Sequence, residues 1–153
     1  MDMSGEQRIP APQQMVWDSL YDPEVLKLCI PGCDSVEKTS ETEFTAKVVV
    51  AVGPVKAKFT GDVSLLDIDA PNSCTISGKG NGGIAGFGKG NAKVELTADG
   101  NDTILKYTAQ ASVGGKLAQI GARLVDSTAK KLADEFFKRF VAHMTEKAAS
   151  GRA

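Results

Sequence analysis

The chain has 153 residues, of which 42% are apolar and 24% charged, and its formal net charge is −1. This size and composition are typical of one folded domain that buries its own core without disulfides or a structural metal. No apolar run approaches the roughly 18 residues that a membrane-spanning helix needs, so the sequence argues against an integral membrane protein.

The charge distribution and the cysteine content limit the cell compartments and the binding partners that we expect. The N-terminus lacks a basic segment followed by an apolar one, and three cysteines are an odd number for a secreted disulfide framework, so the cytoplasm is expected. Residues 116–153 carry eight basic and four acidic side chains, which indicates either a solvated helix face or a contact with an acidic partner or anionic lipid. No basic cluster is interleaved with aromatic residues, so we expect no nucleic-acid partner.

The first part of the chain predicts one short strand and two short helices. Residues 3–9 are expected to form the strand, and Pro12 suits the first turn of a helix over residues 12–21. Asp22-Pro23 begins a second short helix, which Pro31-Gly32 ends.

The middle of the chain predicts antiparallel strands. From Cys33 onward apolar and polar residues alternate, which is the period of a strand with one solvated face. Two alternating runs, 44–52 and 55–65, flank Gly53-Pro54 and indicate a long hairpin. Further strands, separated by turns, are expected over residues 74–82, 86–96 and 105–113.

The last part predicts a helix that closes the domain. From residue 116 to 147 apolar residues recur at spacings of three and four, which indicates one long amphipathic helix. We expect a single domain over residues 1–147 and a disordered tail over residues 148–153. Because strands and helices are segregated, the sequence favours an α+β fold, with six to seven antiparallel strands and a long C-terminal helix, over a parallel βαβ sheet.

The glycine-rich stretch from Gly78 to Gly90 is the most unusual local feature. Gly80, Gly82 and Ala85 match the G-x-G-x-x-A form of a dinucleotide-binding loop. That loop holds phosphate only where a helix follows, and the residues after Gly90 alternate as a strand instead. The pattern therefore argues against a phosphate site.

Glycines on the inward face of two neighbouring strands leave space where side chains would pack. Gly78, Gly80 and Gly82 share one face with core residues, as do three glycines of the next strand, and each costs stability. One explanation is close approach of the long helix to a bent sheet. The other is a ligand cavity between sheet and helix. The sequence leaves both open.

The cavity hypothesis assigns lining residues to the inward faces of the strands and to the start of the long helix. They are Trp17, Leu28, Val48, Val50, Phe59, Gly61, Val63, Ile76, Gly78, Gly80, Gly86, Gly88, Tyr107, Leu117, Ile120 and Leu124, with the small residues Ala46, Ala57, Ala109 and Ala111 as further walls. Ile84 and Phe87, at the tip of the glycine hairpin, are predicted to gate the cavity or dock on something. The alternative is that they pack back onto the first helices.

We predict neither catalytic nor metal-binding residues. Cys29 and Cys33 have a C-x-x-x-C spacing, but no second Cys or His pair accompanies them, so buried inert thiols are expected. His143 is the only histidine and lies near the end of the last helix, which leaves no base for a nucleophile. Asp67 and Asp69 border a turn and make a poor acid–base pair.

A set of short motifs points to a known family. In chain order they are Ile9-Pro10-Ala11-Pro12, Val16-Trp17, Asp22-Pro23, Ile30-Pro31-Gly32-Cys33, Val52-Gly53-Pro54-Val55, Lys58-Phe59-Thr60-Gly61, the Gly78–Gly90 run, Gly114-Gly115-Lys116-Leu117-Ala118-Gln119 and Phe136-Phe137. Together they resemble the CoxG family of carbon monoxide dehydrogenase subunits, within the START/Bet v 1-like (SRPBCC) superfamily, over residues 1–142. The resemblance implies a helix-grip fold, in which a curved antiparallel sheet wraps around the C-terminal helix and encloses an apolar cavity.

The resemblance also implies a function. It indicates a non-catalytic accessory protein of CO dehydrogenase-type molybdenum hydroxylases, which aids membrane recruitment or delivery of an electron acceptor. A quinone or another lipid would be the ligand, no cofactor would be covalently bound, and a peripheral position on the inner face of the membrane is implied beside the cytoplasm. Two alternatives stay open: a polyketide cyclase or aromatase-like enzyme, and a pure assembly factor whose cavity is unused.

Overall fold

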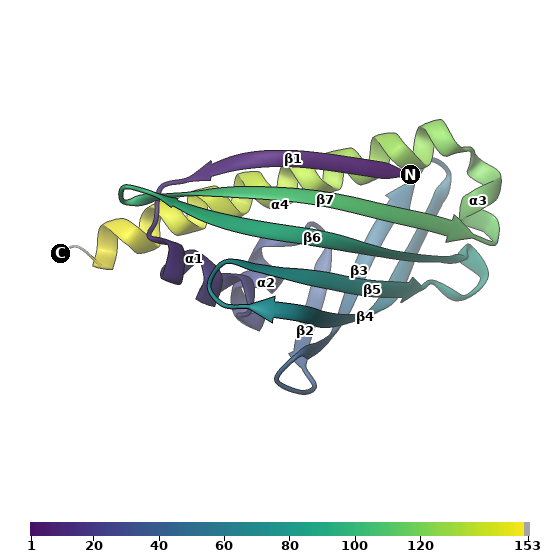
Figure 1. Cartoon of the computed structure of the whole chain (residues 1–153). Coiled ribbons are helices and arrows are strands. Elements are labelled where there is room, and N and C mark those ends of the chain that lie inside the picture. The colour runs from purple at the N-terminus through teal and green to yellow at the C-terminus, as the bar shows by residue number, and fades with distance from the viewer. Residues whose placement is uncertain (152–153) are drawn as a thin grey trace.

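The computed structural model describes residues 1–151, in which a single sheet wraps around a long helix (Figure 1). The strands are β1 (Asp2–Ile9), β2 (Cys33–Lys38), β3 (Glu43–Val52), β4 (Val55–Asp69), β5 (Ser73–Asn81), β6 (Phe87–Asp99) and β7 (Asp102–Gly114). The helices are α1 (Gln13–Leu20), α2 (Pro23–Cys29), the 3₁₀ helix η1 (Gly83–Ala85), α3 (Lys116–Ile120) and α4 (Ala122–Gly151). The predicted α+β class and element order are confirmed.

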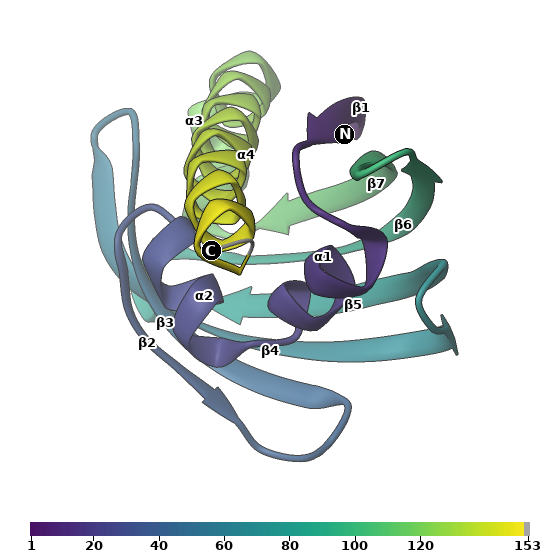
Figure 2. The same cartoon turned by 90° about the vertical axis from the view of Figure 1, so that its left-hand side faces the viewer.

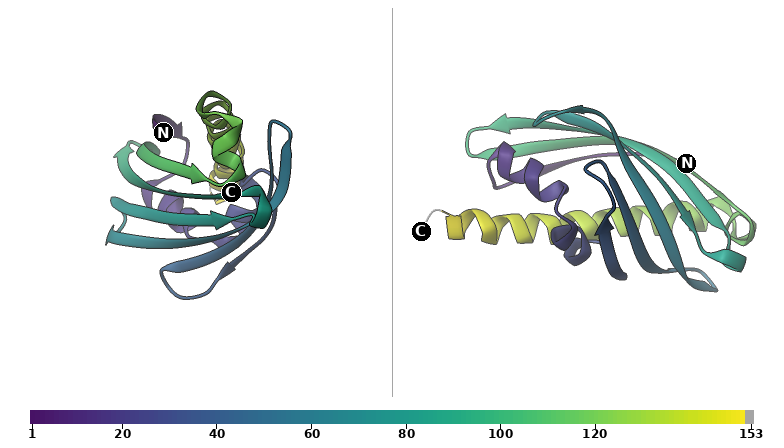
Figure 3. Two further views of the ribbon diagram at one scale, coloured as in Figure 1. Left: turned by 90° about the vertical axis from the view of Figure 1, so that its right-hand side faces the viewer. Right: turned by 90° about the horizontal axis from the view of Figure 1, so that it is seen from below.

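The sheet is antiparallel and has the order β1-β7-β6-β5-β4-β3-β2. Strands β2 to β7 pair with their neighbours in the chain, and β1 returns to the far edge beside β7. Figures 2 and 3 show the sheet curving around α4, with α1 and α2 under one end of the concave face. This is the helix-grip arrangement expected from the resemblance.

Buried side chains form two clusters at opposite ends of the concave face. The first core joins α1 and α2 to the ends of several strands and to the last turns of α4, where Phe140 and Met144 are fully buried. The second core joins the β3–β4 turn, η1, α3 and the start of α4, through Val52, Leu117 and Val125 among others. Between the two cores, inward-facing residues stay partly exposed.

The C-terminal helix differs from the prediction at both ends. Gly121, with φ of +112°, separates α3 from α4, because that backbone region suits glycine and ends the first helix. A 3.6-residue period cannot reveal such a break. Residues 148–151 continue α4 rather than beginning a disordered tail, and residues 152–153 lie outside the described part of the chain.

α4 is long but not apolar throughout. It has 30 residues, and its buried positions, such as Phe140, Met144 and Ala148, recur along one face. Within residues 1–151, no helix combines the length and the hydropathy needed to cross a membrane.

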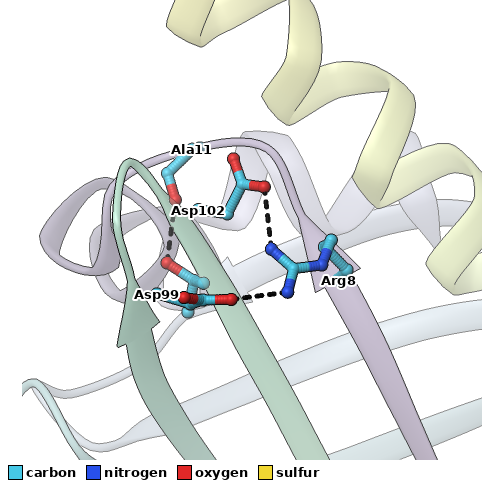
Figure 4. Close-up of polar contacts among 5 residues, drawn as sticks. Arg8, Ala11, Asp99 and Asp102 are labelled. Carbon is cyan, nitrogen blue, oxygen red and sulfur yellow. Dashed lines mark hydrogen bonds and ion pairs between the residues drawn. The ribbon is translucent and has the colours of Figure 1, made fainter.

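Polar contacts fasten the end of β1 to the β6–β7 turn (Figure 4). Arg8 donates hydrogen bonds to the carboxylates of Asp99 and Asp102, but these groups are exposed and water weakens their attraction. The Thr103 hydroxyl, which is fully buried, donates to the Ala11 carbonyl at 2.8 Å. It thus satisfies a backbone acceptor that water does not reach.

We expect Thr103→Val to lower the free energy of unfolding by about 1–3 kcal/mol, because the Ala11 carbonyl would stay buried without a donor. Urea denaturation measures the change. Thr108→Val, on the solvent face of the same strand, is the matched control and should shift stability by less than about 0.5 kcal/mol. Equal losses in both variants would contradict a role for the buried bond.

Candidate ligand-binding site

Glycines of three neighbouring strands lie opposite one another on the concave face of the sheet. Gly61 of β4 pairs with Gly80 of β5, and Gly80 pairs with Gly88 of β6. Two residues along the strands, Gly78 pairs with Gly90. Because none of these positions carries a side chain, the middle of the sheet presents bare backbone toward α4.

The distances around these glycines test the two explanations for them, which are close approach of α4 and a ligand cavity. A Cβ atom placed at Gly61, Gly78, Gly80 or Gly88 would meet nothing closer than 3.6 Å, and its only neighbours within 4 Å belong to adjacent strands. No atom of α4 comes that near, so close approach of the helix does not require these four glycines. Gly90 differs, because its Cβ would lie 2.7 Å from the Gln110 carbonyl oxygen.

A pocket of about 350 Å³ lies against this bare region. Its walls are almost entirely apolar, and its volume lies in the lower part of the range for small-molecule sites, about 300–1,000 Å³. The lining residues are Val50, Val52, Phe59, Gly78, Lys79, Gly80, Gly88, Lys89, Gly90, Ala111, Ser112, Val113 and Leu117.

A larger hollow of about 910 Å³ follows the same strands but has polar walls. Many of its lining residues, such as Thr45, Asp62, Asn91 and Gln110, are outward-facing positions of the sheet, and Thr45 donates a hydrogen bond to Asp62. This lining is mainly polar, although it includes Phe44 and Val63, so the smaller, more apolar pocket is the better candidate for an apolar ligand.

Seven of the predicted lining residues meet in the pocket. Val50 and Phe59 come from the β3–β4 hairpin, Leu117 from α3, Ala111 from β7, and the glycines at positions 78, 80 and 88 from β5 and β6. Sequence reasoning left Val52 and Val113 out of the site, although their alternation with polar neighbours placed both on the same face as the glycines. Strand register, which sequence does not supply, was the missing information.

Three predicted residues, Trp17, Tyr107 and Ile76, belong to the first core instead. Trp17 is 5% exposed and packs its ring 4.8 Å from that of Tyr21. Tyr107 stacks on Phe137 at 5.2 Å between ring centroids. Val48, Gly61 and Val63 lie on the concave face of the sheet but outside the pocket lining.

Four other predicted residues are placed differently from the expectation. Leu28 is 63% exposed on α2, so it does not wall a cavity. Ile120 packs into the second core, and Leu124 is 40% exposed at the start of α4. Gly86 serves a close backbone approach, since its φ is +111° and a Cβ there would lie 2.5 Å from the Gly114 carbonyl oxygen.

The two predicted gate or docking residues lie at the exposed end of the β5–β6 hairpin. Ile84 is 95% exposed at the tip, and Phe87 is 52% exposed. The Phe87 ring covers Gly114, its partner directly across on β7, so it faces outward and does not line the pocket. Neither residue packs back onto the first helices, which lie at the other end of the sheet (Figure 1).

The buried titratable groups of the interior lie in the first core rather than in the pocket. Burial raises the pKa of the Cys29 and Cys74 thiols, and it raises the pKa of the Tyr21 hydroxyl beside Cys74. These groups stay protonated at neutral pH and offer neither a thiolate nor a base. Across residues 1–151, no cluster of three or more His, Cys, Asp or Glu side chains could hold a metal ion.

Comparison with solved structures defines the class of protein. A START superfamily protein from Mycobacterium smegmatis has a TM-score of 0.74 at 10% identity, over 95% of this chain and 97% of that one. The Zhui aromatase/cyclase from Streptomyces sp. R1128 has a TM-score of 0.70 at 14% identity, over 96% and 94%. At these identities the likeness shows the fold alone, and that fold is the START-like, SRPBCC fold.

The family follows from closer matches. A conserved protein from Geobacillus kaustophilus is 32% identical, with a TM-score of 0.87 over 95% of this chain and 96% of that one. The model of the CoxG family, which is named for a subunit of carbon monoxide dehydrogenase, matches residues 5–145, so the chain belongs to the CoxG family. No curated protein matched closely enough to count as a relative. The resemblance carried by the short motifs is confirmed.

We expect Gly80→Ala to raise the free energy of unfolding by roughly 0.5–1 kcal/mol, because a Cβ there has room and reduces the entropy lost on folding. Gly90→Ala, the matched control on the next strand, should lower stability, since its Cβ would press on the Gln110 carbonyl. Urea denaturation of both variants measures the difference. Destabilisation by Gly80→Ala would contradict open space at that position.

Proposed function

We propose that the protein is non-catalytic and holds an elongated apolar molecule, such as a quinone or another lipid, in the glycine-lined pocket. The observation that carries this proposal is the pocket itself, whose apolar walls include bare backbone of β5 and β6. Burying about 200 Å² of apolar ligand surface would contribute about 5 kcal/mol, so a few polar contacts suffice to orient the molecule.

A ligand longer than the pocket could continue along the concave face. Ala46, Val48 and Ala109 point toward the interior yet stay partly exposed, whereas residues at both ends of the face are buried. This strip of partly exposed residues, the hollow of the concave face, joins the two cores. We propose that the pocket takes one end of the molecule and that an isoprenoid or acyl chain follows this hollow.

We further propose that the protein serves a CO dehydrogenase-type molybdenum hydroxylase, by aiding its recruitment to the membrane or by delivering an electron acceptor. The name of the family links its members to carbon monoxide dehydrogenase, which supports this partner. A quinone is an apolar molecule that accepts electrons. A quinone bound in the pocket would therefore serve as the electron acceptor that the protein delivers to the hydroxylase. As part of this proposal, the protein works in the cytoplasm or at the inner face of the membrane, without a covalently bound cofactor.

An enzymatic role is the weaker candidate. The Zhui aromatase/cyclase shares the fold, but acid–base catalysis needs titratable groups at the substrate. Lys79 and Lys89, the titratable residues in the pocket lining, lie at exposed positions that alternate with the inward-facing glycines. The buried thiols and the Tyr21 hydroxyl lie in the first core.

We expect the double variant Gly80→Leu/Gly88→Leu to bind apolar ligands at least tenfold more weakly, because two leucine side chains would fill the pocket. Both positions accept a Cβ without backbone strain. Native mass spectrometry and titration with a panel of ubiquinone, menaquinone and phospholipids measure binding. Asn91→Leu, which adds the same bulk on the solvent face of β6, is the control and should bind normally.

Two outcomes would contradict the proposal. If the wild-type pocket stays empty across the panel, the ligand-binding role is wrong. If the double variant captures a hydroxylase as efficiently as the wild type, the pocket is unnecessary for that partner, which favours a pure assembly factor.

A further inference from the structure

The end of the molecule that carries the β5–β6 turn exposes apolar side chains from separate segments. Ile84 in η1 is 95% exposed, Phe87 at the start of β6 is 52% exposed, and Leu124 at the start of α4 is 40% exposed. The segments that carry them gather at one end of the sheet, beyond the second core (Figures 1 and 3). Ile84 is the most exposed of the three, because it occupies a short turn with little packed over it.

The same end is basic. Residues 50–60, 79–90 and 112–125, which form most of it, contain no aspartate or glutamate, and the carboxylates that border them are Asp2 of β1 and Asp126 of α4. The exposed cations of these segments are Lys56, Lys58, Lys79, Lys89, Lys116 and Arg123. The turns at the opposite end of the sheet carry Glu41, Asp69, Asp99 and Asp102 instead. The turns at the two ends of the sheet therefore differ in charge, although Arg8 pairs with Asp99 and Asp102 at the acidic end.

Most of the cations at this end lack internal partners. Lys79 and Lys89 lie directly opposite each other in the β5–β6 register, where like charges repel. Asp62, opposite Lys79 on β4, accepts a hydrogen bond from Thr45 and forms no ion pair with the lysine. Lys58 pairs with Asp34, whereas none of the other five cations is in an ion pair with any described residue. An external anionic surface would relieve the repulsion among them.

We propose that this end docks on an anionic lipid bilayer, with Ile84 entering the interface between headgroups and acyl chains and with the cations near lipid phosphates. A projecting apolar side chain set among cations fits such an interface, where apolar insertion and attraction to anionic lipid act together. A protein partner would instead bury a broader patch with a packed apolar centre. The side chains at this end come from a narrow turn and two flanking segments, which form no such patch.

Docking at this end adds a membrane-binding surface to the proposed function. The biological role of docking rests on that function. Leu117 and Val113 line the pocket and belong to the segments beside the tip, so the pocket would lie next to the bilayer. An apolar molecule could then move between membrane and pocket without crossing bulk water. Docking itself rests on exposure and charge, so it can be measured without any ligand.

Co-sedimentation with phosphatidylcholine vesicles, with and without phosphatidylglycerol, tests the proposal on the full chain. The wild type should bind the anionic vesicles and dissociate as salt rises. Lys79→Gln/Lys89→Gln should bind roughly 25-fold more weakly, at about fivefold for each charge. Ile84→Asp should bind at least about tenfold more weakly, because the buried side chain is lost.

Matched control variants test whether weaker vesicle binding comes from the docking surface itself. The other possible causes are a lower net charge and misfolding. Lys38→Gln/Lys138→Gln removes two cations elsewhere, and Ile68→Asp changes a 45% exposed isoleucine near the opposite end. Both should bind like the wild type, because their positions lie beyond the reach of the surface field. Circular dichroism and thermal unfolding should be unchanged in all variants, since every altered side chain is exposed.

Each contrary result has a distinct meaning. Normal vesicle binding by Ile84→Asp would overturn insertion of the tip. A wild type that ignores anionic vesicles but binds soluble polyglutamate through Lys79 and Lys89 would overturn the bilayer in favour of an acidic protein. Vesicle binding by a protein whose pocket stays empty would overturn the proposed function alone, and ligand binding without vesicle binding would overturn docking alone.

Discussion

The structure depends on how α4 packs against the sheet. Helix and sheet meet in two cores, one around Phe140 and Met144 and the other around Val125, and α4 lies close to β1 and β3 near the two margins of the sheet. These contacts fix the helix at both ends and hold it away from the central strands. Because the central strands carry glycines there, inward-facing residues between the cores stay partly exposed, and the pocket lies where this glycine region meets the second core.

This arrangement has a cost that the two cores offset. Four glycines with room for a side chain destabilise their strands by about 2–4 kcal/mol in total, a large share of the 5–15 kcal/mol that stabilises a typical domain. A sequence under pressure for stability alone would fill such positions, because alanine or valine fits a strand better. Retained space at the expense of stability is the pattern expected of a binding site.

Much of this fold could be predicted from sequence, because each element has a strong local pattern. Alternation predicted the strands and the inward face of Gly78, Gly80 and Gly88, and helical spacing predicted α4. The break between α3 and α4 at Gly121 was not predicted, since the apolar spacing continues across it. The misplacement of Leu28 and Phe87 has a different origin: their directions depend on tertiary packing and on pairing with β7. The basic end of the molecule, around the β5–β6 turn, was not predicted because its charges come from segments far apart in the sequence.

The turns at the two ends of the sheet differ in charge, so the two ends differ in their attraction to an anionic surface. With 30 residues, α4 is about 45 Å long, several times the Debye length of about 8 Å in physiological salt. Near a negatively charged surface, only the closer end of the protein would therefore interact appreciably. A protein that arrives basic end first is attracted, and one that arrives acidic end first is repelled. The surface field would thus orient the protein before contact. Collisions that lead to docking would then be more frequent than for a protein that arrives in random orientations.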